Sequence, residues 1–181
     1  MDERGTKGLA IILSVFTIGV LFGAAVSTII LANPVFFTRG CSFQPYITPS
    51  SESELVSMIE NAHDSVYVEC YLLTNDKIIE SIIGAKRRGL DVRVLLDPTV
   101  EENADAFLVL SENGVPVKWS SQHFTRTHAK MVLVDKSAVF IGSSNLTYHG
   151  FHKNRETNVI ISGCNVSIYV NTFEEDWKAA G

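Results

Sequence analysis

The sequence has few cysteines and no excess of basic residues, and both shortages restrict its chemistry. Its three cysteines form no C-x-x-C pair and have no zinc-ligand spacing with histidine, so we expect no zinc site. An odd number of cysteines gives no complete disulfide framework, although Cys41 and Cys164 could pair in an oxidising compartment. Lysine and arginine total 15 against 20 acidic residues, a net charge of −5. A strongly basic nucleic-acid-binding surface is therefore excluded, and any contact with a polyanion must be local.

Charge is also absent from residues 8–32, a run of 25 residues rich in isoleucine, leucine, valine and phenylalanine. About 20 apolar residues suffice to cross a bilayer, and signal peptides usually have a shorter apolar core of about 7–15 residues. We therefore expect an uncleaved transmembrane anchor rather than a cleaved signal peptide. Arg4 and Lys7 precede the run and Arg39 follows it. This slight bias favours an N-inside orientation, which would place the following domain outside the cytoplasm.

The rest of the chain is long enough for one domain with an adequate core. Apolar alternation and helical periodicity predict an α/β domain, with a polar loop at 146–155. The expected organisation is a short polar N-terminus at 1–7, the anchor at 8–32, a linker at 33–42 and the domain at 43–181. The expected strands lie near 43–48, 65–72, 91–96, 115–119, 130–134, 138–141 and 158–161, and the expected helices near 51–62, 76–88, 101–112 and 165–179.

The apolar runs at 130–134 and 138–141 predict a hairpin with a tight turn at Lys136-Ser137. In the strand at 65–72, Glu69 shares a face with two tyrosines. A carboxylate on a sheet face could be functional, but solvent or a dimer interface would explain it as easily.

Four polar side chains gather at one end of the predicted hairpin. His128 and Lys130 are two residues apart, so both leave the same face where the first strand begins. Ser143 and Asn145, also two apart, follow the end of the antiparallel neighbour, which lies beside that same point. One imidazole, one ammonium, one hydroxyl and one amide therefore converge on a small volume. This combination is typical of a phosphate site that contains a nucleophile.

The residue types suit displacement at phosphorus. Neutral imidazole can attack phosphorus and form a phosphohistidine, which divides one difficult displacement into two easier ones. Lys130, Ser143 and Asn145 would donate to the phosphoryl oxygens, where charge is concentrated in the transition state. No carboxylate cluster accompanies these residues, so neither Mg²⁺ nor another cofactor is expected. A lone histidine at a strand start is more often a surface residue, so the joint spacing carries the prediction.

This spacing resembles the signature of the phospholipase D superfamily, H-x-K-x4-D followed by G-S-x-N. Both halves are intact here, because Asp135 completes the first half and Gly142-Ser143-Ser144-Asn145 supplies the second. The resemblance extends over roughly residues 42–179 and includes the segment 85–97. It implies a phospholipase D-like mixed β-sheet flanked by helices, here preceded by an N-terminal transmembrane helix.

The resemblance also assigns roles to individual residues. Glu156 matches a further glutamate of the family, which would hold the imidazole in its reactive tautomer. Asp135 and Gly142 would be structural members of the motif. Arg126, two residues before the nucleophile, is a candidate for contacting substrate. His123 lies in the same loop, where a histidine is more often incidental.

The motif occurs once, whereas most family members carry two copies in one chain. Single-copy members, such as the bacterial endonuclease branch and the mitochondrial Zucchini branch, resemble this chain in length and act as homodimers. By that resemblance His128 of one subunit attacks the phosphodiester and His128 of the other protonates the leaving oxygen, without a metal. The lack of a zinc-ligand pattern departs from Zucchini-type members that carry an extra zinc element.

The substrate stays open at this point. The single-copy architecture favours a nuclease that cuts DNA or RNA, whereas the membrane anchor would suit a phospholipase acting on lipid of its own membrane. A protein that binds phosphodiesters without turnover is a third possibility, although a pure binder has no use for a nucleophile. Aromatic residues in the loop at 146–155 could stack on bases or lie against lipid, and the sequence does not choose between them.

Overall fold

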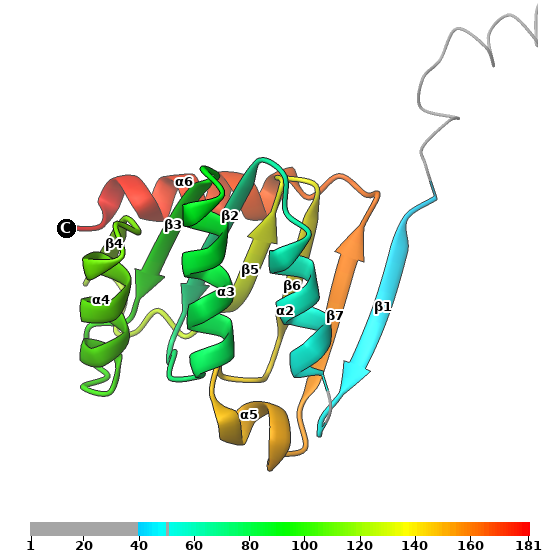
Figure 1. Ribbon diagram of the computed structural model, residues 1–181, viewed down its shortest axis with the longest axis horizontal. Coiled ribbons are helices and arrows are strands. Elements are labelled where there is room, and N and C mark those ends of the chain that lie inside the picture. Colours follow the sequence, from blue (N-terminus) through cyan, green and yellow to red (C-terminus); the bar gives the residue numbers. More distant parts are fainter. Residues whose placement is uncertain (1–39, 50) are drawn as a thin grey trace, which may run out of the picture. The chain divides into compact units, whose positions relative to one another are not determined.

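A seven-stranded mixed sheet forms the centre of the computed structural model, which describes residues 40–49 and 51–181 (Figure 1). Its order is β1-β7-β6-β5-β2-β3-β4. The strands are β1 (Ser42–Ile47), β2 (Ser65–Cys70), β3 (Asp91–Leu96), β4 (Val117–Trp119), β5 (Lys130–Val134), β6 (Ala138–Gly142) and β7 (Thr157–Ser162). The helices are α2 (Glu52–Glu60), α3 (Asp76–Arg87), α4 (Asn103–Glu112), α5 (Tyr148–His152) and α6 (Ser167–Ala179).

The sheet combines a parallel and an antiparallel part. β2, β3 and β4 run parallel, and α3 and α4 supply the crossovers that parallel neighbours require. The other pairs, β2–β5, β5–β6, β6–β7 and β7–β1, are antiparallel. The mixed sheet with flanking helices agrees with the architecture expected from the sequence.

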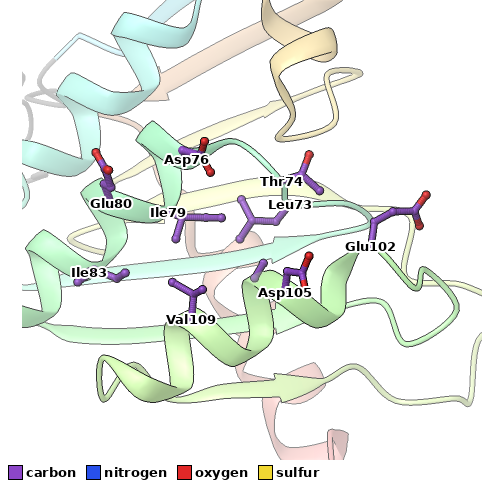
Figure 2. Close-up of a pocket in the computed structure, with 10 residues that line it drawn as sticks. Leu73, Thr74, Asp76, Ile79, Glu80, Ile83, Glu102, Asp105 and Val109 are labelled. Carbon is purple, nitrogen blue, oxygen red and sulfur yellow. The ribbon is translucent and has the colours of Figure 1, made fainter.

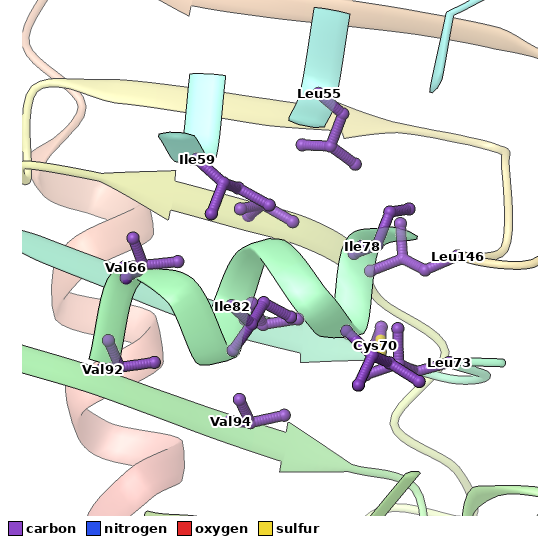
Figure 3. Packing of buried hydrophobic residues seen from close by; sticks show 14 of the residues in the cluster. Leu55, Ile59, Val66, Cys70, Leu73, Ile78, Ile82, Val92, Val94 and Leu146 are labelled. Carbon is purple, nitrogen blue, oxygen red and sulfur yellow. The ribbon is translucent and has the colours of Figure 1, made fainter. Parts of the chain in front are cut away.

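Helices cover both faces of the sheet, with α2, α3 and α4 on one side and α6 on the other (Figure 1). The alternation along β2 assigns Val66 and Val68 to the first side, where they join Ile82 of α3 in the buried core shown in Figure 3. Tyr67 points to the second side and stacks on Phe173 of α6, with ring centroids 4.8 Å apart. Burying large apolar side chains on both faces stabilises the sheet and fixes its register.

The hairpin turn begins one residue earlier than expected. Asp135 and Lys136 both have φ of 52°, and the amide of Ser137 donates to the carbonyl of Val134 at 3.1 Å. Two central residues with positive φ are typical of the type I′ turn, whose twist matches that of the flanking strands. The turn therefore begins at Asp135 and includes the expected Lys136 and Ser137, because Asp135 tolerates positive φ despite its side chain.

The segment 146–155 is not simply a loop, because it contains the five-residue helix α5. The Thr147 hydroxyl caps this helix by accepting from the amide of Gly150 at 2.9 Å. A helix of this length has too few turns to show an apolar period, so only the capping threonine could have indicated it.

Glu69 is buried rather than exposed to solvent, with 5% of its surface accessible. It lies on the α6 side of the sheet, and its Oε2 atom has no hydrogen-bond partner. Burial raises the pKa of Glu69 to about 7, and the charge of Asp176 on α6 acts in the same direction. The expectation that solvent accounts for this carboxylate was therefore wrong.

A disulfide joins Cys41, just before β1, to Cys164, just after β7. It ties the edge strand β1 to its neighbour, a pairing that the cysteine count had left open. Cys70 is free and buried in the core. In the part of the chain that the structure describes, no helix is both long and apolar enough to span a bilayer. The expected anchor at 8–32 lies outside the described residues.

Candidate active site

The site lies at the edge of the sheet where β2 and β6 end and β5 and β7 begin (Figure 1). His128 comes two residues before β5, Lys130 is the first residue of that strand and Ser143 directly follows β6. Glu156 directly precedes β7. Antiparallel pairing brings these ends together because each strand returns beside the one before it.

Lys130 contacts the imidazole of His128 directly. Its Nζ atom lies 3.2 Å from Nδ1 and 3.3 Å from Nε2, and donates to the His128 carbonyl oxygen at 3.0 Å. Lys130 is 8% exposed, whereas His128 is exposed. Burial lowers the pKa of Lys130, and the nearby carboxylate of Glu156 acts against this shift. The ammonium is thus held beside an imidazole that remains open to a substrate.

Tyr71 forms an aromatic wall of the site that sequence reasoning missed. Its ring centroid lies 4.5 Å from that of His128 and 5.2 Å from Lys130 Nζ. The Tyr71 amide donates to the carbonyl of Ala129 at 2.9 Å, which places the residue beside the entry to β5. Tyr71 was noted in the sequence only as one of the tyrosines on the Glu69 face, because nothing local connects it to a motif far along the chain.

A buried asparagine fixes the loops around this aromatic wall. Asn103, fully buried, donates to the carbonyl oxygens of Tyr71 at 2.9 Å and Asp97 at 3.0 Å. Its own Oδ1 atom accepts from the amide of Leu73 at 3.0 Å. These three bonds join the ends of β2 and β3 to the start of α4, so they hold the site rigidly.

The hydroxyl of Ser143 donates to Glu156 Oε2 at 2.5 Å and accepts from the amide of Thr157 at 3.1 Å. Asn154 donates to the other oxygen of Glu156 at 3.0 Å. Thr48, which directly follows β1, anchors this segment because its hydroxyl accepts from the Glu156 amide at 2.7 Å. Among residues 40–49 and 51–181, no hydrogen bond joins Glu156 to His128 of the same chain.

The G-S-x-N segment follows a backbone path that requires glycine. A Cβ atom on Gly142 would lie 2.2 Å from Asn158 Oδ1 and 2.5 Å from the Thr157 carbonyl oxygen. The Asn158 side chain instead accepts from the Ser144 amide at 3.2 Å and donates to its hydroxyl at 2.8 Å. Asn145 is partly buried, and its Oδ1 atom has no hydrogen-bond partner. This oxygen can only accept, so only the side-chain NH2 group of Asn145 is able to donate to a phosphate.

Arg126 lies in the loop that enters the motif, and a buried carboxylate anchors that loop. Asp97 Oδ2 accepts from the Thr127 amide at 2.5 Å, and its Oδ1 atom accepts from the Thr99 amide at 2.8 Å. Arg126 is exposed, and its guanidinium carbon lies 6.0 Å from the Tyr71 ring centroid. An acidic residue at the end of a buried parallel strand was the only signal in the sequence for the role of Asp97.

Asp135 lies at the opposite end of β5 from His128. Its carboxylate accepts from the amides of His63 at 3.1 Å, Asp64 at 2.7 Å and Ser65 at 3.0 Å. Burial acts to raise the pKa of Asp135, but these backbone donors outweigh it and hold the pKa below its usual value. Asp135 therefore fastens the hairpin turn to the start of β2, which agrees with a structural role.

Within the described residues, no group of three or more His, Cys, Asp or Glu side chains is arranged to hold a metal ion. Acidic side chains do gather around a separate hollow between α3 and α4 (Figure 2). This hollow has an apolar floor that includes Ile79 and Ile83, and none of the motif residues lines it. Its rim carries Asp76, Glu80, Glu102 and Asp105. A rim of four carboxylates repels a phosphodiester, so this hollow is not a phosphate site.

Residues 55–177 match the family model described as "Cardiolipin synthase, PLD-like domain". The DISARM protein DrmC of Bacillus paralicheniformis is 28% identical over 125 residues, which is 65% of this chain and 52% of that protein. A phospholipase D of Rickettsia prowazekii is 29% identical over 108 residues, which is 59% of this chain and 52% of that protein. The chain thus spans about half the length of these curated relatives.

Among solved structures, the chain is similar to Nuc from Salmonella typhimurium, a phospholipase D family member. The TM-score is 0.73 at 26% identity. The match covers 78% of this chain and 97% of Nuc. Almost the whole of Nuc therefore corresponds to the single domain described here.

Proposed function

Because the chain belongs to the phospholipase D superfamily, we propose that it is a metal-independent nuclease that hydrolyses DNA or RNA. The observation that carries this proposal is the convergence of His128, Lys130 and Ser143 at one sheet edge, with the imidazole exposed and the ammonium 3.2 Å from it. An exposed nucleophile beside fixed donors is what displacement at a phosphodiester requires.

The reaction proceeds in two displacements. A ring nitrogen of His128 attacks phosphorus, the bond from phosphorus to the leaving oxygen breaks, and that oxygen takes a proton from a second imidazole. Water then attacks the phosphohistidine, gives its proton to the second imidazole, and the phosphorus–nitrogen bond breaks. Lys130, Ser143 and Asn145 bind the phosphoryl oxygens, which carry the developing charge in both steps.

The second imidazole belongs to another copy of the chain, so the active form is a homodimer. The described residues supply one motif with one His128, and Glu156 bonds to Ser143 and Asn154 rather than to that imidazole. Each of its oxygens keeps a second lone pair, through which Glu156 is proposed to orient the His128 of a second copy.

Exposed apolar side chains on the α6 side of the sheet support this assembly. Phe43 and Ile47 of β1 are four residues apart, so they share one face, and they are 63% and 48% exposed. They share the α6 side of the sheet with Val139 and Ile161, and Ile168 on α6 is 69% exposed. Exposed apolar side chains gathered on one side are typical of an interaction surface.

Two further features support a proposal for the cellular location. Residues 8–32 are proposed to anchor the protein in a membrane as a single-pass helix. The disulfide between Cys41 and Cys164 supports an oxidising compartment, so we propose that the domain lies outside the cytoplasm, as the charge bias around the anchor also favours.

Nucleic acid is favoured over lipid because the chain corresponds to nearly all of Nuc and carries a single motif, as the endonuclease branch does. Lipid hydrolysis at the membrane surface is the second candidate. The apolar run at 8–32 and the similarity to a phospholipase D favour it.

The test incubates the full-length protein in detergent micelles with labelled single-stranded DNA, RNA or phospholipid, in EDTA. The His128→Asn variant is assayed beside it. Strand cleavage by the wild type alone supports the nuclease, and lipid hydrolysis alone moves the assignment to a phospholipase. Equal cleavage by both proteins contradicts the mechanism. Wild-type cleavage that occurs only when EDTA is omitted contradicts its independence of metal.

A further inference from the structure

A second hollow opens beside the catalytic edge, under the loop that leads into the motif. It has a volume of about 330 Å³. Phe124 stands at this hollow with 61% of its surface exposed. Apart from Phe124 its walls are mostly polar, formed by Asp97, Pro98, Thr99, Ser121, Gln122, Thr125 and Arg126. An aromatic ring that stays exposed beside polar groups is available to a ligand with a flat face and polar edges.

The hollow is held in place by the network that positions the catalytic loop. Asp97 lies at its base, fully buried, with one oxygen bonded to Thr127 and the other to Thr99. Both carboxylate oxygens are therefore occupied by donors of the chain itself. Thr127 adjoins His128, so the same carboxylate fixes the hollow and the start of the motif relative to each other.

Arg126 links the hollow to the catalytic centre. It lines the hollow, and its guanidinium carbon lies 6.0 Å from the ring centroid of Tyr71, which is itself 4.5 Å from the ring of His128. Arg126 therefore lies between the hollow and the nucleophile His128. A nucleotide next to the scissile phosphate has its groups in the same order: its base, then its own phosphate, then the scissile phosphate.

We propose that this hollow binds the base of an unpaired nucleotide adjacent to the scissile phosphate, so that the substrate is single-stranded nucleic acid. The proposal rests on the nuclease function proposed above. The base stacks on Phe124, its polar edge faces Ser121, Gln122 and Thr125, and its phosphate contacts Arg126.

The composition of the hollow distinguishes a base from the other ligands considered. An acyl chain would leave the hydroxyl and amide groups of the walls without partners, which costs free energy in a lipid site. A duplex keeps its bases stacked and paired, so none is free to lie against Phe124. Stacking on an aromatic side chain therefore selects an unpaired strand.

The experiment compares the full-length wild type with Phe124→Ala, Phe124→Trp and the control Leu108→Ala, which removes an exposed apolar side chain from α4. Each protein is assayed on a labelled single-stranded oligodeoxynucleotide, the corresponding RNA, the same DNA as a duplex, and diethyl phosphate, a small diester with neither a base nor an aromatic ring. Binding of the single strand is also measured by fluorescence anisotropy, in proteins that carry His128→Asn as well.

Phe124→Ala is expected to weaken binding and kcat/KM for the single strands by a factor of about 10 to 100, mainly through KM, because stacking on one aromatic residue contributes on that order. Hydrolysis of the small diester is expected to be unchanged, Phe124→Trp to retain activity on single strands, and Leu108→Ala to behave as wild type. The wild type is expected to cleave the duplex more slowly than the single strand.

The proposal is overturned if Phe124→Ala leaves single-strand binding unchanged, if it slows the small diester equally, or if the duplex is the better substrate. A different result would contradict the nuclease function alone. If no diester is hydrolysed but the single strand still binds and Phe124→Ala weakens that binding, the base-binding hollow is supported and the catalytic assignment is wrong.

Discussion

The hydroxyl proton of Ser143 is directed at Glu156 rather than at the space in front of His128. Ser143 Oγ accepts from the Thr157 amide at 3.1 Å, which leaves its proton to the carboxylate of Glu156 at 2.5 Å. The same carboxylate acts on Lys130, whose pKa burial lowers and Glu156 helps to restore. One carboxylate therefore takes the hydroxyl proton of Ser143, which must turn away from Glu156 to donate to a phosphate, and helps to keep the Lys130 ammonium charged.

Replacing Glu156 by glutamine is expected to lower kcat by about 10- to 100-fold with little change in KM. The amide keeps the shape of the side chain but loses the charge that supports Lys130 and orients Ser143. Steady-state kinetics on the wild type and Glu156→Gln would measure this. Glu60→Gln, an exposed carboxylate at the end of α2, is the control and should match the wild type. A Glu156→Gln protein with full kcat would contradict the role.

Glu69 is expected to make the fold less stable as the pH rises. Its pKa is about 7 when folded, against an ordinary value of 4.5, so the folded protein holds a proton that the unfolded chain releases. The stability that the bound proton of Glu69 contributes is complete below the pKa of Glu69 in the unfolded chain, and it is lost as the pH rises through about 7.

Urea unfolding of the wild type and Glu69→Gln at about pH 5 and pH 8 would measure this loss. Because glutamine stays neutral, the wild type should lose about 1–3 kcal/mol of unfolding free energy relative to the variant over that interval. Identical pH dependence in both proteins would show that Glu69 is not protonated in the fold.

Gly142→Ala is expected to destabilise the protein by about 1–3 kcal/mol, because the added methyl group would overlap the Thr157 carbonyl and the Asn158 side chain. Gly84→Ala is a matched control on α3, where the nearest atom to the new Cβ is Arg88 Nη1 at 3.8 Å. That change should stabilise the helix by up to about 1 kcal/mol. Thermal unfolding of both variants tests the pair, and equal stabilities would contradict the close packing at Gly142.

Removing the disulfide by Cys41→Ser with Cys164→Ser is expected to cost about 2–4 kcal/mol, because the bond closes a loop with a sequence separation of 123. Unfolding with and without dithiothreitol would measure the effect. The reductant should destabilise the wild type and leave the double variant unchanged, since Cys70 is free and buried in both. Sensitivity of the double variant to the reductant would mean that another thiol bond is involved.

Much of the fold and the centre of the site could be predicted from the sequence because both depend on local pattern. A β-strand places alternate residues on opposite faces, so apolar alternation marked the strands and set His128 and Lys130 on one side of a strand start. The spacing to Ser143 and Asn145 then followed from the hairpin, since antiparallel neighbours return to the same edge. The roles of these residues in catalysis remain predictions.

Only the tertiary structure could decide which distant residues complete the site and what covers each face. Tyr71, Asp97 and Asn103 meet the motif through chain reversals that no local period records. Alternation placed Glu69 on a face, but the packing of α6 decided that this face is buried. The pairing of Cys41 with Cys164 likewise depended on β1 returning beside β7, because a bond between remote residues is set by the fold that brings them together.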